Sequence, residues 1–350
     1  MKIAIVTVYE SMNAGAYLQA WALKEFLTLN NHQVSYLENN SRPLELITFK
    51  KFQGAMRKGQ FKKAVYVIKN YRAFKKHHKN YQLCRQSFRE MHNQDLFILG
   101  SDEIWNVTKK DMISYPIFWG VGLPNKPIIS YAPSSNNATK KNIEEHDFIP
   151  AALNNICAIS VRDTHTEKLI SALTNKQVTL VSDPTMLFSK EDYEKYTVDI
   201  EDKNYILVYD PYGNFTKVEI EECVKFSKKI NKKLISFGNY LSWCDKTIVS
   251  DPMVYLSYFK NADIIFTGTF HGTIYSMIFN KQFVTLGKIG LKVIHTLEYY
   301  GLESRICEEK SLAALAKKRI DYEPVNCKMK EMRANSALFL TNAISAVSCD

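Results

Sequence analysis

The sequence lacks the cysteine patterns that hold small domains together or bind metal ions. Its seven cysteines are odd in number and scattered along the chain, and no two of them form a C-x-x-C pair. Neither a disulfide framework nor a zinc site is therefore expected. His77 and His78 are neighbours, but they lie in a lysine-rich segment without nearby carboxylates. We predict a protein that works without a metal ion and without a bound cofactor.

Long apolar runs are absent as well. No uninterrupted apolar stretch approaches the ~20 residues that a membrane-spanning helix needs. The first apolar run, residues 3–6, is too short for the core of a secretory signal. These observations predict a cytoplasmic protein. The loop over residues 10–15 has no G-x-G-x-x-G pattern, so the usual dinucleotide fingerprint is missing.

Acidic residues are missing from one long segment. Between Glu45 and Glu90 there is no aspartate or glutamate, whereas the segment holds thirteen lysines and arginines. The whole chain has a net charge of +10, so the remainder is slightly negative. Residues 46–89 are expected to form a basic helical insert, and a solvated helix face is the plainest interpretation of such a charge run. Nucleic acid is not an expected partner, because no recognised binding module accompanies the charge.

The rest of the chain alternates apolar strands with helical patterns. Strands are expected at 2–8, 33–37, 95–100, 128–132, 156–161 and 178–181, and again at 205–209, 233–237 and 263–267. This order predicts an α/β protein with two Rossmann-like domains and a cleft between them. The expected boundaries are 1–195 for the N-terminal domain and 204–327 for the C-terminal domain. A helix at 328–350 is expected to pack back on the N-terminal domain.

The most informative stretch is residues 262–287. An apolar run closes at Gly268, a polar turn with His271 and Gly272 follows, and helical spacing begins at Thr273. A tight turn that opens a helix offers free backbone N–H groups and the positive end of the helix dipole, which suits an anion. The alternative is that the imidazole of His271 merely caps or packs the turn.

Several short motifs along the chain occur in an order typical of one family. They are Asn13-Ala14-Gly15, Gly100-Ser101-Asp102-Glu103-Ile104-Trp105-Asn106, Ser130-Tyr131-Ala132, Ser160-Val161-Arg162-Asp163, Asp183-Pro184-Thr185, Phe270-His271-Gly272-Thr273 and Gly301-Leu302-Glu303-Ser304-Arg305. With this set of motifs the chain resembles the polysaccharide pyruvyl transferases, whose fold is similar to that of GT-B glycosyltransferases. Three positions depart from the family pattern. They are Ala14 in place of an aromatic residue, Glu103 in place of the common glutamine, and Thr269 in place of serine.

The resemblance implies transfer of the enolpyruvyl unit of phosphoenolpyruvate to two hydroxyls of a sugar in a surface-polysaccharide precursor, with a cyclic ketal and phosphate as products. A trianionic donor needs arginine and N–H partners, and the enol carbon needs an acid with a pKa near neutrality. By resemblance, Arg162 and His271 would bind phosphoenolpyruvate and act in catalysis. Gly272 and Thr273 would offer N–H groups to the same anion, and Asn13 and Gly15 would complete the donor site.

The same resemblance places the acceptor at the end of an earlier strand. Asp102 would activate a sugar hydroxyl, Trp105 would stack on the ring, and Ser101 and Asn106 would bind its hydroxyls. Other interpretations stay open: Ser101 and Asp102 as a helix cap, Trp105 as a core residue, and Arg162 with Asp163 as a surface ion pair. Asp183 before Pro184 is interpreted as a turn device and not as a catalytic group.

The resemblance also bears on partners and on alternative functions. Polysaccharide precursors are generally built on lipids at the inner membrane face, so a lipid-linked acceptor and contact of residues 46–89 with anionic lipid are expected. The first alternative is a GT-B glycosyltransferase that uses a nucleotide sugar, and this rests on architecture alone. The second alternative is a non-catalytic member of a polysaccharide assembly complex.

Overall fold

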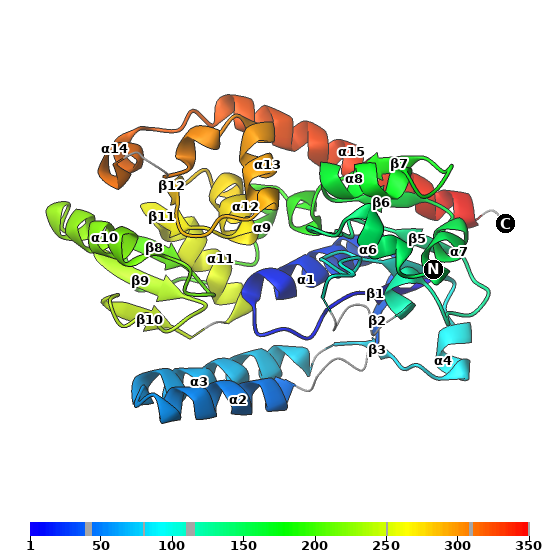
Figure 1. The fold of residues 1–350 in the computed structure, drawn as a ribbon, viewed down its shortest axis with the longest axis horizontal. Coiled ribbons are helices and arrows are strands. Elements are labelled where there is room, and N and C mark those ends of the chain that lie inside the picture. Colours follow the sequence, from blue (N-terminus) through cyan, green and yellow to red (C-terminus); the bar gives the residue numbers. More distant parts are fainter. Residues whose placement is uncertain (39–43, 80, 110–115, 250, 308–310, 349–350) are drawn as a thin grey trace.

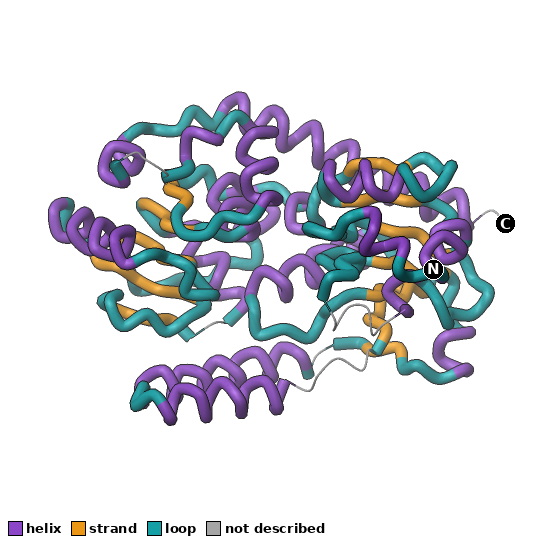
Figure 2. Tube along the Cα trace, in the orientation of Figure 1, coloured by secondary structure: helices purple, strands orange, loops and turns teal. Residues whose placement is uncertain are grey.

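Two parallel five-stranded sheets form the framework of the protein (Figure 1). The computed structural model describes all residues except 39–43, 80, 110–115, 250, 308–310 and 349–350. Parts of the expected segments 46–89 and 328–350 therefore lie outside the described residues. The strands form two separate groups with helices around and between them (Figure 2). The predicted α/β architecture with two Rossmann-like domains is confirmed.

The N-terminal sheet has the strand order β3-β2-β1-β4-β5, and every neighbouring pair is parallel. Its strands are β1 (Lys2–Val6), β2 (Gln33–Leu37), β3 (Leu83–Cys84), β4 (Leu96–Leu99) and β5 (Ile128–Ser130). A further parallel pair, β6 (Ile159–Val161) and β7 (Val178–Leu180), continues this sheet through a bridge between Ile129 and Ala158. The sites of parallel sheets lie at the carboxyl ends of their strands. Asp102 lies three residues after the end of β4, and Arg162 directly follows β6.

The C-terminal sheet repeats the same order, β10-β9-β8-β11-β12, with parallel pairs throughout. Its strands are β8 (Tyr205–Tyr209), β9 (Lys233–Phe237), β10 (Lys246–Ile248), β11 (Ile264–Thr267) and β12 (Gln282–Thr285). Successive residues of β8 enter different cores: Tyr205 and Leu207 pack with the core that is continuous with the N-terminal domain, whereas Ile206 packs on the far face. Such nearly continuous apolar strands are typical of parallel sheets covered on both faces.

Helices connect the strands and cover the sheets. In the N-terminal part they are α1 (Ala14–Leu29), α2 (Leu44–Arg57), α3 (Phe61–His78), α4 (Phe88–His92), α6 (Lys140–Glu144), α7 (Phe148–Asn154), α8 (Thr164–Ser171) and α9 (Lys190–Glu194), with 3-10 turns η1 (Pro116–Trp119) and η2 (Pro184–Leu187). In the C-terminal part they are α10 (Lys217–Lys229), α11 (Pro252–Asn261), α12 (Phe270–Ile278), α13 (Leu291–Tyr300), α14 (Leu312–Lys317) and α15 (Glu323–Ser348), with η3 (Glu303–Arg305).

The last helix, α15, returns from the C-terminal sheet to the N-terminal one (Figure 1). The Ser182 backbone N–H donates to Ser336 Oγ at 2.8 Å, and Arg333 Nε donates to the Met186 carbonyl at 2.9 Å. Both contacts join α15 to the segment around η2, directly beside Asp183. The helix therefore connects the two domains close to the candidate site.

The basic segment is mostly a helical hairpin. Helices α2 and α3 run antiparallel along the lower edge of the molecule in Figure 1 and reach the C-terminal domain, where His77 Nε2 lies 2.9 Å from Asp251 Oδ2 at the start of α11. The expectation of an entirely helical segment is wrong in one place. Residues Leu83–Cys84 form β3 and pair with β2 at the edge of the sheet. A strand of two residues is too short to leave a periodic signal in the sequence.

Candidate active site

Arg162 and Asp183 form a buried ion pair at the centre of the interdomain region. Arg162 follows β6, and its Nη1 donates to Asp183 Oδ2 at 2.7 Å. The two side chains are 3% and 0% exposed. Burial lowers the pKa of Arg162, but the charges of Asp183 and Asp102 outweigh it, so the guanidinium stays protonated. The interpretation of Arg162 as half of a surface pair with Asp163 is wrong, because Asp163 instead caps α8 through the Thr166 N–H.

His271 approaches the same carboxylate from the C-terminal domain. Its Nε2 lies 3.8 Å from Asp183 Oδ2, which is too long for a hydrogen bond, and the side chain is 14% exposed. Burial lowers the pKa of His271 to about 4; Asp183 opposes this shift, and Arg162 adds to it. The imidazole is therefore uncharged at neutral pH. Among the described residues, neither His271 Nε2 nor Arg162 Nη2 has a hydrogen-bond partner, although both atoms are buried.

Gly15, in the first turn of α1, packs closely against the imidazole of His271. A Cβ atom at Gly15 would lie only 2.5 Å from His271 Nδ1 and 2.6 Å from its Cγ, so the first turn of α1 packs directly against the ring. Asn13 is the N-cap of α1, and its Oδ1 accepts from the Gly15 N–H at 2.9 Å. The structure thus brings Gly15 against the imidazole, and Asn13 caps the same helix start. In the structure, however, the amide of Asn13 is used within the protein, and its Nδ2 donates to the Tyr212 hydroxyl at 2.9 Å.

The start of α12 differs from the expectation for Gly272 and Thr273. The Gly272 N–H donates to Thr269 Oγ1 at 3.1 Å, and the Thr273 N–H donates to the Thr269 carbonyl at 3.0 Å. Their N–H groups are therefore not available to an anion, and the earlier assignment is corrected. The N–H groups of Phe270 and His271, the first two positions of the helix, have no acceptor within it. Gly272 is needed for another reason, because a Cβ there would lie 2.1 Å from Thr267 Oγ1.

Asp102 and Glu103 approach the site from the end of β4. Asp102 Oδ1 lies 3.7 Å from Arg162 Nη2, and its side chain is 21% exposed. Asp102 has a positive φ of 74°, a conformation that non-glycine residues adopt mainly where the surrounding structure demands it. Glu103 forms an ion pair with Lys292 of α13 at 2.5 Å and another with Lys109. Burial raises the pKa of Glu103, but the charges of Lys292 and Lys109 outweigh it and keep the pKa well below its ordinary value.

Three of the expected acceptor residues are corrected. Trp105 is fully buried, stacks on Trp119 at 4.9 Å between ring centroids, and donates its N–H to the Phe118 carbonyl, so no ring face is free for a sugar. Ser101 is buried and donates to Gln19. Asn106 is buried, and its Oδ1 accepts from the Thr108 N–H and hydroxyl. All three residues support the loop that carries Asp102.

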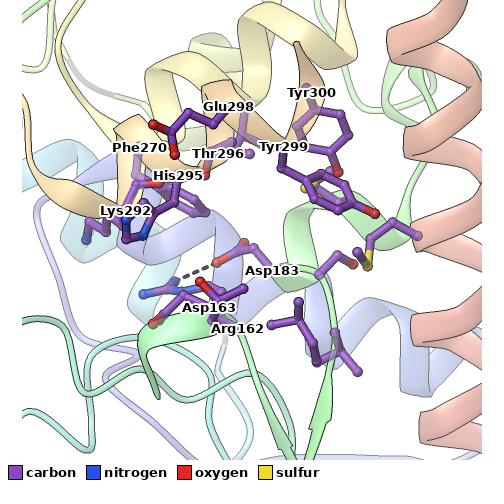
Figure 3. A pocket seen from close by; sticks show the side chains of 17 residues that line it. Arg162, Asp163, Asp183, Phe270, Lys292, His295, Thr296, Glu298, Tyr299 and Tyr300 are labelled. Atoms are coloured by element: carbon purple, nitrogen blue, oxygen red, sulfur yellow. Dashed lines mark hydrogen bonds and ion pairs between the residues drawn. The ribbon is translucent and has the colours of Figure 1, made fainter. Parts of the chain in front are cut away.

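A cavity of about 270 Å³ opens beside this cluster, between the two domains (Figure 3). Arg162 and Asp183 lie on one side of it, and Phe270 and Lys292 face them from the other. The Phe270 ring lies against the guanidinium of Arg162, at 5.0 Å, and near the ammonium of Lys292, at 5.7 Å. The other lining residues include two carboxylates, Asp163 and Glu298. The rest are Thr164, Leu180, Val181, Ser182, Met186, Ile274, His295, Thr296, Tyr299, Tyr300 and Met332. His271 does not line this cavity and reaches Asp183 from the side on which α1 begins.

Sequence reasoning missed two residues of the site. Asp183 was set aside as a turn device, and it does cap η2, since its Oδ1 accepts from the Thr185 N–H and hydroxyl. Its second oxygen holds Arg162. Burial raises the pKa of Asp183, but His271, Arg162 and the Thr185 hydroxyl outweigh it, so this carboxylate is ionised. Nothing in the sequence indicated that Lys292 belongs to the site, because it is an ordinary lysine near the start of a helix.

Comparison with solved structures identifies the type of fold. The structure is similar to the glycosyltransferase SnogD from Streptomyces nogalater, with a TM-score of 0.51, 10% sequence identity, and coverage of 100% of this chain and 99% of that one. It is also similar to S. aureus MnaA in its structure with UDP, with a TM-score of 0.50, 11% identity, and coverage of 96% of this chain and 91% of that one. The values for UDP-GlcNAc 2-epimerase from Neisseria meningitidis are a TM-score of 0.50, 8% identity, and coverage of 99% and 100%. At these identities the likeness concerns the fold alone, which is GT-B-like.

The family follows from the sequence. The model of the polysaccharide pyruvyl transferase family matches residues 13–287, which is most of the chain. The protein therefore belongs to this family, and the resemblance found from the motifs is confirmed. A search of curated proteins found no significant match. Among the described residues, no helix combines the length and the apolar character needed to span a bilayer.

Proposed function

We propose that this protein transfers the enolpyruvyl group of phosphoenolpyruvate to two hydroxyls of a sugar in a polysaccharide precursor. The observation that carries the proposal is a pair of buried nitrogen atoms near Asp183, Arg162 Nη2 and His271 Nε2, that have no hydrogen-bond partner among the described residues. Buried polar atoms in native proteins are almost always hydrogen-bonded. An anionic ligand would satisfy both nitrogens, with the imidazole donating from Nε2.

The donor site follows from these two nitrogens and from the start of α12. Arg162 presents a fixed cationic N–H to a phosphate or carboxylate oxygen because Asp183 holds its other nitrogen. The N–H groups of Phe270 and His271 point out of the helix start, where the dipole favours an anion. Lys292 lines the cavity from α13, where Glu103 holds its ammonium. Asp183 is a positioning residue, since Arg162 and Thr185 occupy its oxygens.

Chemistry begins with a proton that is delivered to the methylene carbon of phosphoenolpyruvate, which leaves an oxocarbenium-like centre at the neighbouring carbon. A sugar hydroxyl adds to that centre and loses its proton. Phosphate departs with the electrons of its C–O bond, and the second hydroxyl adds to the same carbon and gives its proton to the departing phosphate, which closes the ketal. His271 is uncharged in the free protein, but a phosphate dianion beside it favours the imidazolium. We assign His271 the roles of phosphate ligand and proton donor, and Asp102, which is partly exposed, the role of base for the sugar hydroxyl.

The proposal is tested by mass spectrometry of glycan from cells that carry the wild-type protein or His271→Gln. Wild-type glycan should contain a pyruvate ketal, and the variant should reduce the fraction of pyruvylated repeats at least ~100-fold, as expected when a group that both binds and transfers a proton is lost. His92→Gln is the matched control, because His92 is an exposed residue on α4 that bonds only the Phe88 carbonyl. Unmodified wild-type glycan, together with nucleotide release from a sugar nucleotide, would instead support a glycosyltransferase.

We further propose that the hairpin of α2 and α3 contacts an anionic membrane surface, where a lipid-linked acceptor would lie. Its solvent-facing side combines basic residues with exposed apolar side chains, which are Leu46, Phe49 and Met56 on α2 and Phe61 and Val65 on α3. Helices that carry lysines and exposed aromatic residues on one side bind the headgroup region through both electrostatic attraction and apolar burial. The protein would then work in the cytoplasm, at the inner face of the membrane.

Co-sedimentation with vesicles tests this contact. The protein should bind vesicles that contain phosphatidylglycerol at low salt, release them at high salt, and ignore pure phosphatidylcholine. The double variant Phe49→Asp/Phe61→Asp should lower the partition coefficient at least ~10-fold, since two apolar anchors become charged. Leu29→Asp/Val218→Asp adds the same charge at exposed positions on α1 and α10 and should bind like the wild type. Equal losses in both variants, or no binding at low salt, would refute the contact.

A further inference from the structure

A second interdomain cavity lies on the inner side of the hairpin. It has a volume of about 330 Å³ and is enclosed by α2 and α3 on one side and by residues 211–212 and 238–239 of the C-terminal domain on the other. Figure 1 shows the hairpin running alongside this domain, below β10. The His77–Asp251 pair holds the two parts together. This cavity is distinct from the one beside Asp183, and the family resemblance assigns no role to it.

The charge of this cavity is of one sign. Among the described residues, three lysines line it, Lys51, Lys58 and Lys63, and no aspartate or glutamate does. The surrounding protein atoms lower the pKa of Lys51, and the ammonium of Lys63 lowers it further, so these charges are close enough to repel one another. Like charges gathered in a hollow without a counter-charge cost free energy, and an anion between them removes that cost.

Neutral side chains in the cavity suit the same kind of ligand. Tyr212 and Asn239 lie among the lysines. The Tyr212 hydroxyl accepts from Asn13 and keeps its own hydrogen, and the Asn239 amide has a second N–H besides the one that donates to the Asp210 carbonyl. A volume of this size accommodates a phosphate or a diphosphate group, and lysines bind such groups as point charges.

A short series of contacts connects this cavity with the candidate active site. Tyr212 lines the cavity, and its hydroxyl accepts from Asn13 Nδ2. Asn13 caps the helix whose Gly15 packs on His271. Adjacent protein atoms, and then the charge of Asp102, raise the pKa of Tyr212, which places the phenol within electrostatic reach of the proposed base. A ligand that extends from the lysines past Tyr212 would therefore run toward the start of α1 and the candidate active site.

We infer that this lysine cavity binds the phosphate or diphosphate group through which the acceptor sugar is attached to its carrier. The sugar would then extend past Tyr212 toward Asp102, while the exposed face of the hairpin stays free for other contacts. The identity of the bound molecule as the acceptor rests on the proposed function. The anion site itself does not, because it follows from the lysines and the cavity alone.

Calorimetric titration with inorganic diphosphate tests the site in the full-length protein. Phosphoenolpyruvate is kept at saturating concentration so that the donor site is occupied. Lys51→Ala/Lys63→Ala should weaken diphosphate binding at least ~10-fold relative to the wild type, as expected for the loss of two direct cationic contacts. The matched control is Lys50→Ala/Lys62→Ala, which removes the same charge from adjacent positions of the same two helices that do not line the cavity. It should bind within ~2-fold of the wild type.

The outcomes separate this inference from its alternatives. Equal weakening in both variants would show a diffuse effect of net charge and would refute the site, as would an absence of binding in the wild type. Two further ligands identify the carrier: tighter binding of a short-chain prenyl diphosphate indicates a lipid, and tighter binding of uridine diphosphate indicates a nucleotide. Binding is measured without turnover, so failure of pyruvyl transfer leaves this result intact, and a failure here leaves the ketal in the glycan unaffected.

Discussion

Arg162→Lys should lower kcat/KM for phosphate release from phosphoenolpyruvate by about 100-fold. A hydrogen bond to a charged group contributes roughly 2–3 kcal/mol, which corresponds to that factor in rate. Lysine keeps the positive charge that Asp183 requires, so a buried uncompensated carboxylate is avoided. The substitution removes Nη2, the nitrogen that has no hydrogen-bond partner among the described residues and that we propose binds the donor, while Nη1 is held at 2.7 Å by Asp183.

Two measurements make this result specific. Thermal unfolding should show that Arg162→Lys is folded, and Arg319→Lys, an exposed substitution in the C-terminal domain, should retain full activity. If Arg162→Lys kept kcat/KM within ~3-fold of the wild type, the guanidinium would serve only to neutralise Asp183, and the donor-binding role would have to be abandoned.

Gly15→Ala should also lower kcat/KM for phosphate release by about 100-fold, although glycine has no side chain that could take part in the reaction. The new methyl group would lie 2.5 Å from His271 Nδ1, so the imidazole or the start of α1 has to move. A displacement of about 1 Å in a catalytic group is enough to lower the rate ~100-fold. Alanine is favoured over glycine inside a helix by up to ~1 kcal/mol, so helix propensity itself does not predict unfolding.

Gly290→Ala is the matched control for that experiment. Gly290 directly precedes α13, its φ of −83° suits alanine, and a Cβ atom there would meet nothing within 4 Å. This variant should keep full activity, because the new methyl group displaces no neighbour and Gly290 lines neither cavity. If Gly15→Ala were as active as Gly290→Ala, the contact between α1 and the imidazole would have no role in positioning His271.

The fold was predictable because its signals are local. Strands such as Gln33–Leu37, Tyr205–Tyr209 and Lys233–Phe237 begin and end where their apolar runs do. Strand β10 and the two-residue β3 were missed, since edge strands this short depend on pairing with a neighbour that is far away in the sequence. The family was predictable because its motifs are ordered along the whole chain.

The site was less predictable, and the errors have a common physical origin. Trp105 follows a strand end, where a sugar platform and a core residue look alike in sequence. The partner that decides between them, Trp119, is part of a separate turn. Gly272 and Thr273 were expected to offer N–H groups, but the hydroxyl and carbonyl of Thr269 take them. Asp183 was underestimated instead of overestimated. Its sequence context indicates only a turn, but the same carboxylate both caps η2 and binds Arg162.

Helix α15 has a mechanical consequence. The chain passes between the two sheets twice, once between α9 and β8 and once along α15, and the second passage is anchored beside η2 by Ser336 and Arg333. Two covalent crossings define an axis, so the domains can turn about it but cannot simply separate. The edge opposite α15 is where the hairpin meets the C-terminal domain through His77 and Asp251. Widening the cleft about this axis would break the His77–Asp251 contact, together with the Asn13–Tyr212 hydrogen bond.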